Sequence, residues 1–164
     1  MNKHDSMRGW FAYELYQHMA KDPRIWLIVG DLGYGVFDAI RSDFSERFIN
    51  TGAAETAMMD IAVGLSLEGK IPVVYSITPF LIYRPFEVWR TYINHENLHI
   101  IGAGSGRDDD YKHDGYSHNA EDVQGILKTL PNIRQYYPPT KEDIPYLLES
   151  CIKDPSPYFI SLRR

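Results

Sequence analysis

The sequence has little of three features that mark special classes of protein. It contains one cysteine in 164 residues, which excludes a disulfide framework within the chain and favours a reducing compartment such as the cytoplasm. No apolar run is long enough to span a membrane, and the N-terminus lacks the apolar stretch of a secretory signal. Lysine and arginine form no cluster, so neither nucleic acid nor a membrane is an expected partner.

The composition is that of a folded protein. Hydrophobic residues make up 44% of the chain and aromatic residues 13%, with a net charge of −5, which disfavours a disordered segment. The length fits a single domain covering residues 1–164. The lone cysteine, Cys151, falls in the apolar pattern YLLESCI, so we predict a core thiol and not a nucleophile.

Apolar patterns predict an alternation of strands and helices. Short continuous runs such as IWLIV and YFISL are typical of strands that are buried on both faces of a parallel sheet. The alternation indicates an α/β domain with a mainly parallel sheet flanked by helices. The predicted strands are 25–29, 48–50, 71–76, 98–103, 133–137 and 158–162, and the predicted helices are 6–20, 36–44, 55–67, 85–95, 120–130 and 141–152.

Four loops follow predicted strands, where open α/β sheets bind their ligands. Within them, Asp31 either lines a site or caps the next helix, and Glu55 begins a helix, where acids are common for electrostatic reasons alone. The acids of 108–110 are consecutive and point in different directions, so we predict a solvated loop and no metal site. The four loops are 30–35, 51–55, 77–84 and 105–119.

Several motifs resemble the pyrimidine-binding domain of the transketolase family of thiamine diphosphate enzymes. The run FINTGAAETAMMDIAVGLSLEGKIPVVYSITPFLIYRPFE is similar to the family pattern R-F-hydrophobic-N-x-G-(I/A)-A-E-x-x-M, followed by G-x-x-P and three spaced aromatics. The segment HDGYSH resembles D-G-x-(T/S)-H, and LKTLPNIRQYYPPTKED resembles a later family segment. Because these motifs occur in order over almost the whole chain, the resemblance implies the thiamin-diphosphate-binding fold.

The resemblance implies cofactor contacts for five residues. Glu55 corresponds to the family glutamate that shares a proton with the aminopyrimidine ring, which makes the exocyclic nitrogen a base. Phe80, Tyr83 and Phe86 correspond to the aromatic wall of that ring. The alternative is a core-facing helical stripe, which Pro79 and Pro85 disfavour, although Pro85 also departs from transketolases proper. Asp31 corresponds to an aspartate near the cofactor in some members.

The resemblance also implies a substrate site. Asp114 and His118 correspond to residues that contact sugar hydroxyls and the oxygens of the donor, and His118 would be catalytic because imidazole donates and accepts near neutral pH. The alternative is a solvated loop with an incidental histidine. The resemblance places Tyr116 where transketolases usually carry proline or a similar residue, and this difference bears on which acceptor fits. Arg84 and Arg107 are the obvious candidates for contacting a phosphate.

One part of the family pattern is missing. The sequence has no Gly-Asp-Gly with a downstream Asn, the family marker of the diphosphate and metal site. It ends at Arg164, so the domain that follows in full-length transketolases is also expected to be absent. We therefore expect a split enzyme in which a complementary subunit holds the diphosphate and Mg²⁺, most simply an α2β2 hetero-oligomer with no metal ligand on this chain.

The expected activity is that of a transferase in carbohydrate metabolism. The resemblance implies transfer of a two-carbon ketol unit between sugars or sugar phosphates. Two alternatives stay open: a subunit of a 2-oxo acid decarboxylase or deoxyxylulose-phosphate-synthase-like enzyme, and a non-catalytic interaction module that kept the fold. The presence of Glu55 disfavours the last of these.

Overall fold

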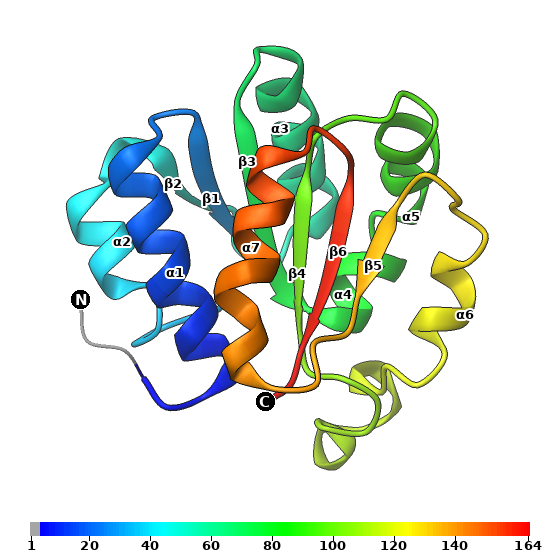
Figure 1. Ribbon diagram of the computed structural model, residues 1–164. Helices are drawn as coiled ribbons and strands as arrows, with labels where there is room; N and C mark the ends of the chain where they lie inside the picture. Colours follow the sequence, from blue (N-terminus) through cyan, green and yellow to red (C-terminus); the bar gives the residue numbers. More distant parts are fainter. Residues whose placement is uncertain (1–3) are drawn as a thin grey trace.

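The sheet is parallel throughout and occupies the centre of the molecule. The computed structural model describes residues 4–164. Its sheet has six strands in the order β2-β1-β3-β4-β6-β5, and every neighbouring pair is parallel (Figure 1). The predicted α/β fold is therefore confirmed. The strands are β1 (Ile25–Val29), β2 (Phe48–Asn50), β3 (Ile71–Ile77), β4 (Ile101–Ser105), β5 (Arg134–Tyr136) and β6 (Tyr158–Leu162).

Helices cover both faces of the sheet and form two separate cores. Successive strand residues point to opposite faces, so Val73 belongs to one core and Val74 to the other. One face packs against α1 (Met7–Lys21), α2 (Asp38–Asp43) and α7 (Ile144–Lys153). The other packs against α3 (Glu55–Leu67), α4 (Thr78–Tyr83), α5 (Phe86–Val88), the π-helical turn η2 (Trp89–Asn94) and α6 (Val123–Leu127). Short 3₁₀ turns are η1 (Ser45–Arg47), η3 (Lys112–Asp114), η4 (Tyr116–His118) and η5 (Lys141–Asp143).

The segment after β3 differs from the sequence prediction. Most of the predicted loop 77–84 is the helix α4, because Pro79 lies in the first turn, where no N–H donor is needed. The predicted helix 85–95 is divided into α5 and η2. Pro85 lies before both of them and separates α5 from α4, because proline cannot continue a regular helix. The predicted helix 120–130 is regular only in α6, and β4 begins at Ile101, where its pairing with Val73 starts.

The strand order places a topological switch point at the carboxyl ends of β1 and β3. From β1 the chain moves outward to β2 on one side, then returns to β3 on the other side of β1. At such a switch point the following connections leave the sheet in opposite directions, which opens a site for ligands. The helix α3 starts shortly after β2, at the same edge of the sheet.

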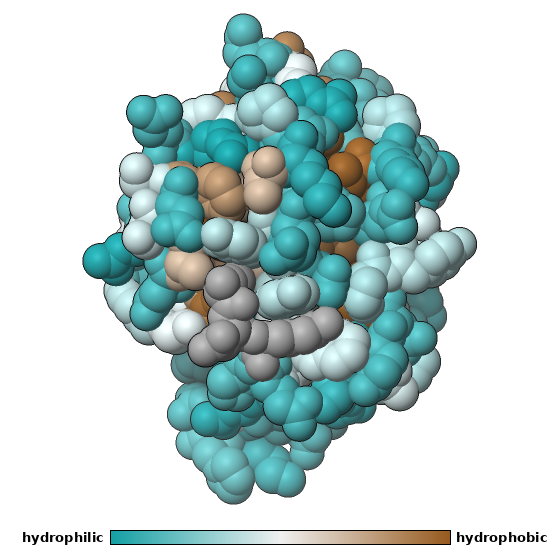
Figure 2. Space-filling view, turned by 60° about the vertical axis from the view of Figure 1, so that its left-hand side comes forward, coloured by the Kyte–Doolittle hydropathy of each residue, from teal (hydrophilic) through white to brown (hydrophobic). Residues whose placement is uncertain are grey.

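Within residues 4–164, every helix falls short of the length and apolar character needed to cross a bilayer. The face shown in Figure 2 is mainly hydrophilic, with apolar side chains in small separate areas. Cys151 is fully buried, and burial raises the pKa of its thiol to about 12, which confirms the predicted core thiol.

Candidate functional site

A buried carboxylate lies at the carboxyl ends of β1 and β3. Glu55 is the first residue of α3, and its side chain is only 2% exposed. Ser76, near the end of β3, donates its hydroxyl to Oε1 at 3.3 Å, and Nη1 of Arg84 lies 2.7 Å from Oε2. A Cβ at Gly30, just past β1, would lie 3.2 Å from the Ser76 hydroxyl and 3.5 Å from Oε1. The absent side chain at Gly30 therefore leaves room for this carboxylate.

Phe80 lies between Arg84, the partner of this carboxylate, and His118, which belongs to the predicted substrate loop 105–119. Phe80, in α4, has the guanidinium carbon of Arg84 3.8 Å from its ring centroid. The ring of His118 meets Phe80 edge to face, with the centroids 4.8 Å apart. Tyr111 lies behind His118 at 6.4 Å and shares a hydrogen bond of 2.9 Å with the Ser105 hydroxyl at the end of β4. The structure thus brings three of the predicted site residues, Glu55, Phe80 and His118, into one cluster.

The other two predicted wall aromatics lie differently. Tyr83 is partly exposed at the end of α4, and its partial burial and a hydrogen bond with Asp122 raise the pKa of its hydroxyl. Phe86, in α5, packs against the second core and lines a hollow of about 530 Å³ together with Arg90 and Asn94. The structure therefore sets Phe86 in a separate hollow, and the cofactor contacts of Tyr83 and Phe86 stay predictions.

Asp31 organises the loop that follows β1. Its backbone is left-handed, with φ of 54°, and its carboxylate accepts hydrogen bonds from the hydroxyl of Tyr34 and, at 3.4 Å, from the amide of Asn50. The N-cap of α2 is Phe37, so the interpretation of Asp31 as a helix cap is wrong. Asn50 also accepts from the backbone of Gly52 at 3.0 Å, which links this loop to the turn before α3. A cofactor contact of Asp31 stays a prediction.

The loop that carries the predicted substrate residues is exposed at its tip. Asp114 is exposed in η3, and Tyr116, in η4, has 86% of its surface exposed. Gly115 between them has φ of 89°, a left-handed conformation that glycine adopts without strain. His118 is half-buried because it returns to Phe80. The loop therefore presents Asp114 to solvent and His118 to the cluster, and their substrate contacts stay predictions.

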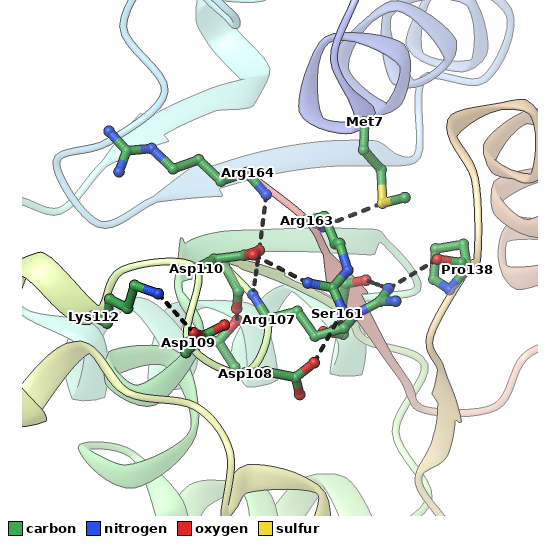
Figure 3. Close-up of polar contacts among 12 residues, drawn as sticks. Met7, Arg107, Asp108, Asp109, Asp110, Lys112, Pro138, Ser161, Arg163 and Arg164 are labelled. Atoms are coloured by element: carbon green, nitrogen blue, oxygen red, sulfur yellow. Dashed lines mark hydrogen bonds and ion pairs between the residues drawn. The ribbon is translucent and has the colours of Figure 1, made fainter.

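The root of this loop is fixed to the end of β6 (Figure 3). Arg107 is 9% exposed, and its guanidinium donates to the backbone carbonyls of Pro138, at 3.0 Å, and Ser161. Asp110 accepts from the backbone N–H of Arg107 at 2.9 Å and of Arg164 at 3.0 Å. Arg107 is committed to these carbonyls, so it is a poor candidate for contacting a phosphate.

The acidic run 108–110 forms more ion pairs and hydrogen bonds than the predicted solvated loop would. Arg163 pairs with Asp108 at 3.1 Å and with Asp110 at 3.2 Å, while Asp109 pairs with Lys112 at 3.3 Å (Figure 3). Asp108 and Asp109 are exposed, as predicted, but Asp110 is largely covered and ties three backbone and side-chain donors together. These acids therefore hold the base of the loop.

Sequence reasoning missed the neighbours of Glu55. Ser76 had a weak signal, since it is a polar residue at the end of an otherwise apolar strand. Gly30 also follows a buried strand directly, which is typical of a close approach. Nothing in the sequence pairs Arg84 with an acid 29 positions away.

Comparison with known proteins supports the resemblance seen in the sequence. The family model for "Transketolase, pyrimidine binding domain" matches residues 4–164. One subunit of the apulose-4-phosphate transketolase of Actinobacillus succinogenes is 29% identical over 122 residues, which cover 73% of this chain and 39% of that protein. The 6-deoxy-6-sulfo-D-fructose transketolase subunit of a Clostridium species is 24% identical over 159 residues, which cover 96% of this chain and 49% of that protein.

A solved structure gives the same result for the fold. A structure described as a split gene transketolase, an inactive beta4 tetramer, superposes with a TM-score of 0.85 at 27% identity. The match covers 97% of this chain and 51% of that one. The chain thus spans about half the length of this relative, as it does of the Clostridium subunit.

Proposed function

Because this chain belongs to the family of transketolase pyrimidine-binding domains, we propose that it supplies the pyrimidine half of a thiamine diphosphate site in a split transketolase. Two of its relatives are named as transketolase subunits, which supports a divided enzyme. In keeping with these subunit names, a second polypeptide would hold the diphosphate and the Mg²⁺ ion. The site would then be completed only in a hetero-oligomer.

The observation that carries this proposal is the buried carboxylate with an aromatic ring beside it. Glu55 is 2% exposed, and a planar cation, the guanidinium of Arg84, both donates to it and stacks on Phe80. An aminopyrimidine offers the same two features, a flat face and an N–H or ring nitrogen that pairs with a carboxyl. The residues present therefore fit this cofactor.

Each residue of the cluster has a distinct role in the proposed site. Thiamine diphosphate, when bound, supplies the carbon nucleophile and the electron sink for ketol transfer. Glu55 holds a proton at the pyrimidine ring nitrogen, and the Ser76 hydroxyl keeps the carboxyl in place. The side chain of Phe80 stacks on the pyrimidine ring and keeps its edge-to-face contact with His118.

The loop after β4 would contact the sugar. His118 can donate a hydrogen bond to a substrate oxygen or accept one from a hydroxyl, since imidazole has both kinds of nitrogen near neutral pH. Asp114 is exposed and accepts from sugar hydroxyls. The reaction would move a two-carbon ketol unit from a ketose to an aldose. The presence of both Asp114 and His118 favours ketol transfer over decarboxylation of a 2-oxo acid.

The test is reconstitution with the complementary chain. The chain would be co-expressed with the product of a neighbouring gene that encodes Gly-Asp-Gly and a downstream Asn, and ketose consumption would be followed with thiamine diphosphate and Mg²⁺. We expect turnover only when both chains are present. Glu55→Gln should lower turnover by at least about 100-fold, a typical contribution of general acid–base catalysis. Glu68→Gln, at the other end of the same helix, is the matched control and should retain activity.

Three outcomes would count against the proposal. Turnover by this chain alone would remove the need for a partner. Full activity of Glu55→Gln would remove Glu55 from its role. Consumption of pyruvate in place of a ketose donor would show that the pair is a decarboxylase or a deoxyxylulose-phosphate-synthase-like enzyme.

A further inference from the structure

We propose that Arg84 is a plug that closes the pyrimidine site in the free subunit and must swing out before the ring can enter. The inference rests on the proposed function, because it concerns the same half-site. It adds a residue that competes with the cofactor and does not hold it. Arg84 would therefore make cofactor binding conditional on a side-chain movement.

The guanidinium of Arg84 makes the two contacts that a bound aminopyrimidine requires. Its carbon lies 3.8 Å from the centroid of Phe80, so a flat group already covers that ring. Its Nη1 lies 2.7 Å from Oε2 of Glu55, so a planar N–H donor already pairs with the carboxylate. Two planar groups cannot stack on one ring face and pair with one carboxylate oxygen together. Occupation by Arg84 and occupation by the pyrimidine are therefore mutually exclusive.

The opening movement involves only the side chain. The backbone carbonyl of Arg84 accepts a hydrogen bond of 3.4 Å from the hydroxyl of Thr56 in α3, and Pro85 restricts the next backbone position. The side chain is 43% exposed, whereas that of Glu55 is 2% exposed. The guanidinium thus has a route outward to solvent, while the carboxylate stays buried.

A second carboxylate, that of Glu87, lies close enough to pair with the displaced side chain of Arg84. Arg84, Thr56 and Glu87 all line one surface hollow of about 320 Å³. Glu87 is exposed three residues after Arg84, and among residues 4–164 no salt bridge is found for its carboxylate. A carboxylate at this position can accept the released guanidinium. Arg84 therefore has a buried carboxylate as its closed partner and an exposed one as its open partner.

The test measures binding of the pyrimidine fragment to the isolated full chain. The probe is 4-amino-5-hydroxymethyl-2-methylpyrimidine, which lacks the thiazolium charge, and its Kd is obtained from an NMR titration. If the Arg84 side chain occupies the site in about nine-tenths of the molecules, Arg84→Met should lower the Kd about tenfold. The reason is that the apparent affinity scales with the fraction of molecules whose site is free of Arg84. Glu87→Gln should raise the Kd, since it removes the open partner of Arg84.

A matched control separates this effect from the loss of any arginine pair. Arg24 forms an ion pair with Asp22 at 2.7 Å, the same separation, beside the amino end of β1. Arg24→Met should leave the Kd unchanged. In the wild-type chain, the Nε–Hε resonance of Arg84 should shift when the probe binds, which reports the release of the side chain directly.

The outcomes separate the plug from the proposed function. Equal Kd values for wild type and Arg84→Met, both weakened by Glu55→Gln, would overturn the plug and leave the half-site intact. Weaker binding by Arg84→Met would overturn it as well, since Arg84 would then contact the ligand. An unmoved Arg84 resonance during saturation would also contradict the plug. No binding by any variant would refute the half-site itself.

Discussion

The Arg84–Glu55 pair should respond unequally to the loss of its two members. In Arg84→Met, the carboxylate of Glu55, which is 2% exposed in the wild-type chain, keeps only the Ser76 hydroxyl, 3.3 Å away, as a partner. In Glu55→Gln, the guanidinium of Arg84 is 43% exposed and can turn to water. A stranded buried charge is far more costly than a solvated one, so Arg84→Met should be the more destabilising change.

The expected magnitudes follow from this difference in burial. Removing one member of a fully buried pair costs about 3–5 kcal/mol, but the exit of Arg84 also opens the site to water, so we expect roughly 2–3 kcal/mol for Arg84→Met. Glu55→Gln should cost about 1 kcal/mol or less, as for an exposed pair. For a chain of this size, the melting temperature of Arg84→Met should fall by roughly 4–12 °C.

Urea unfolding of the isolated chain at pH 7.5, followed by circular dichroism, measures these free energies. The double variant Glu55→Gln/Arg84→Met should be more stable than Arg84→Met alone, because its buried group is uncharged. Equal costs for the two single changes would refute the reasoning, because they would mean that Glu55 is well solvated without Arg84.

Two further predictions concern other parts of the chain. Arg107→Met should lower the free energy of unfolding by about 3 kcal/mol, because it removes the guanidinium that donates to the buried carbonyls of Pro138 and Ser161. Backbone hydrogen exchange should accelerate in residues 106–119, and unchanged exchange there would contradict the anchoring role of Arg107. Burial lowers the pKa of His99, so the unfolded chain takes up a proton before the folded chain does. The contribution of neutral His99 to stability is therefore full above the ordinary pKa of 6.5 and is lost as the pH falls through the folded-state pKa. His99→Gln should make the free energy of unfolding, measured by urea titration, less dependent on pH between pH 8 and 5.

The sequence by itself determined the main strands, the helix that begins at Glu55 and the family. The bounds of β1, β2, β6 and α3 agree with the prediction, because continuous apolar runs and helical spacing are local patterns that the chain carries without its fold. Glu55 was identified for the same reason, since a family motif is a matter of order and spacing along the chain. Patterns along the chain are therefore enough to predict the secondary-structure element of a residue and its correspondence to a family motif.

Which groups meet was decided only by the tertiary structure. Arg84 reaches Glu55 because α4 and α3 both begin at the carboxyl edge of the sheet, and their separation in sequence of 29 residues gives no hint of it. Asp110 meets Arg163, 53 positions away, because β4 and β6 are neighbours in the sheet. Contacts of this kind depend on strand order and helix packing, which bring distant segments together and decide how much water each charge retains.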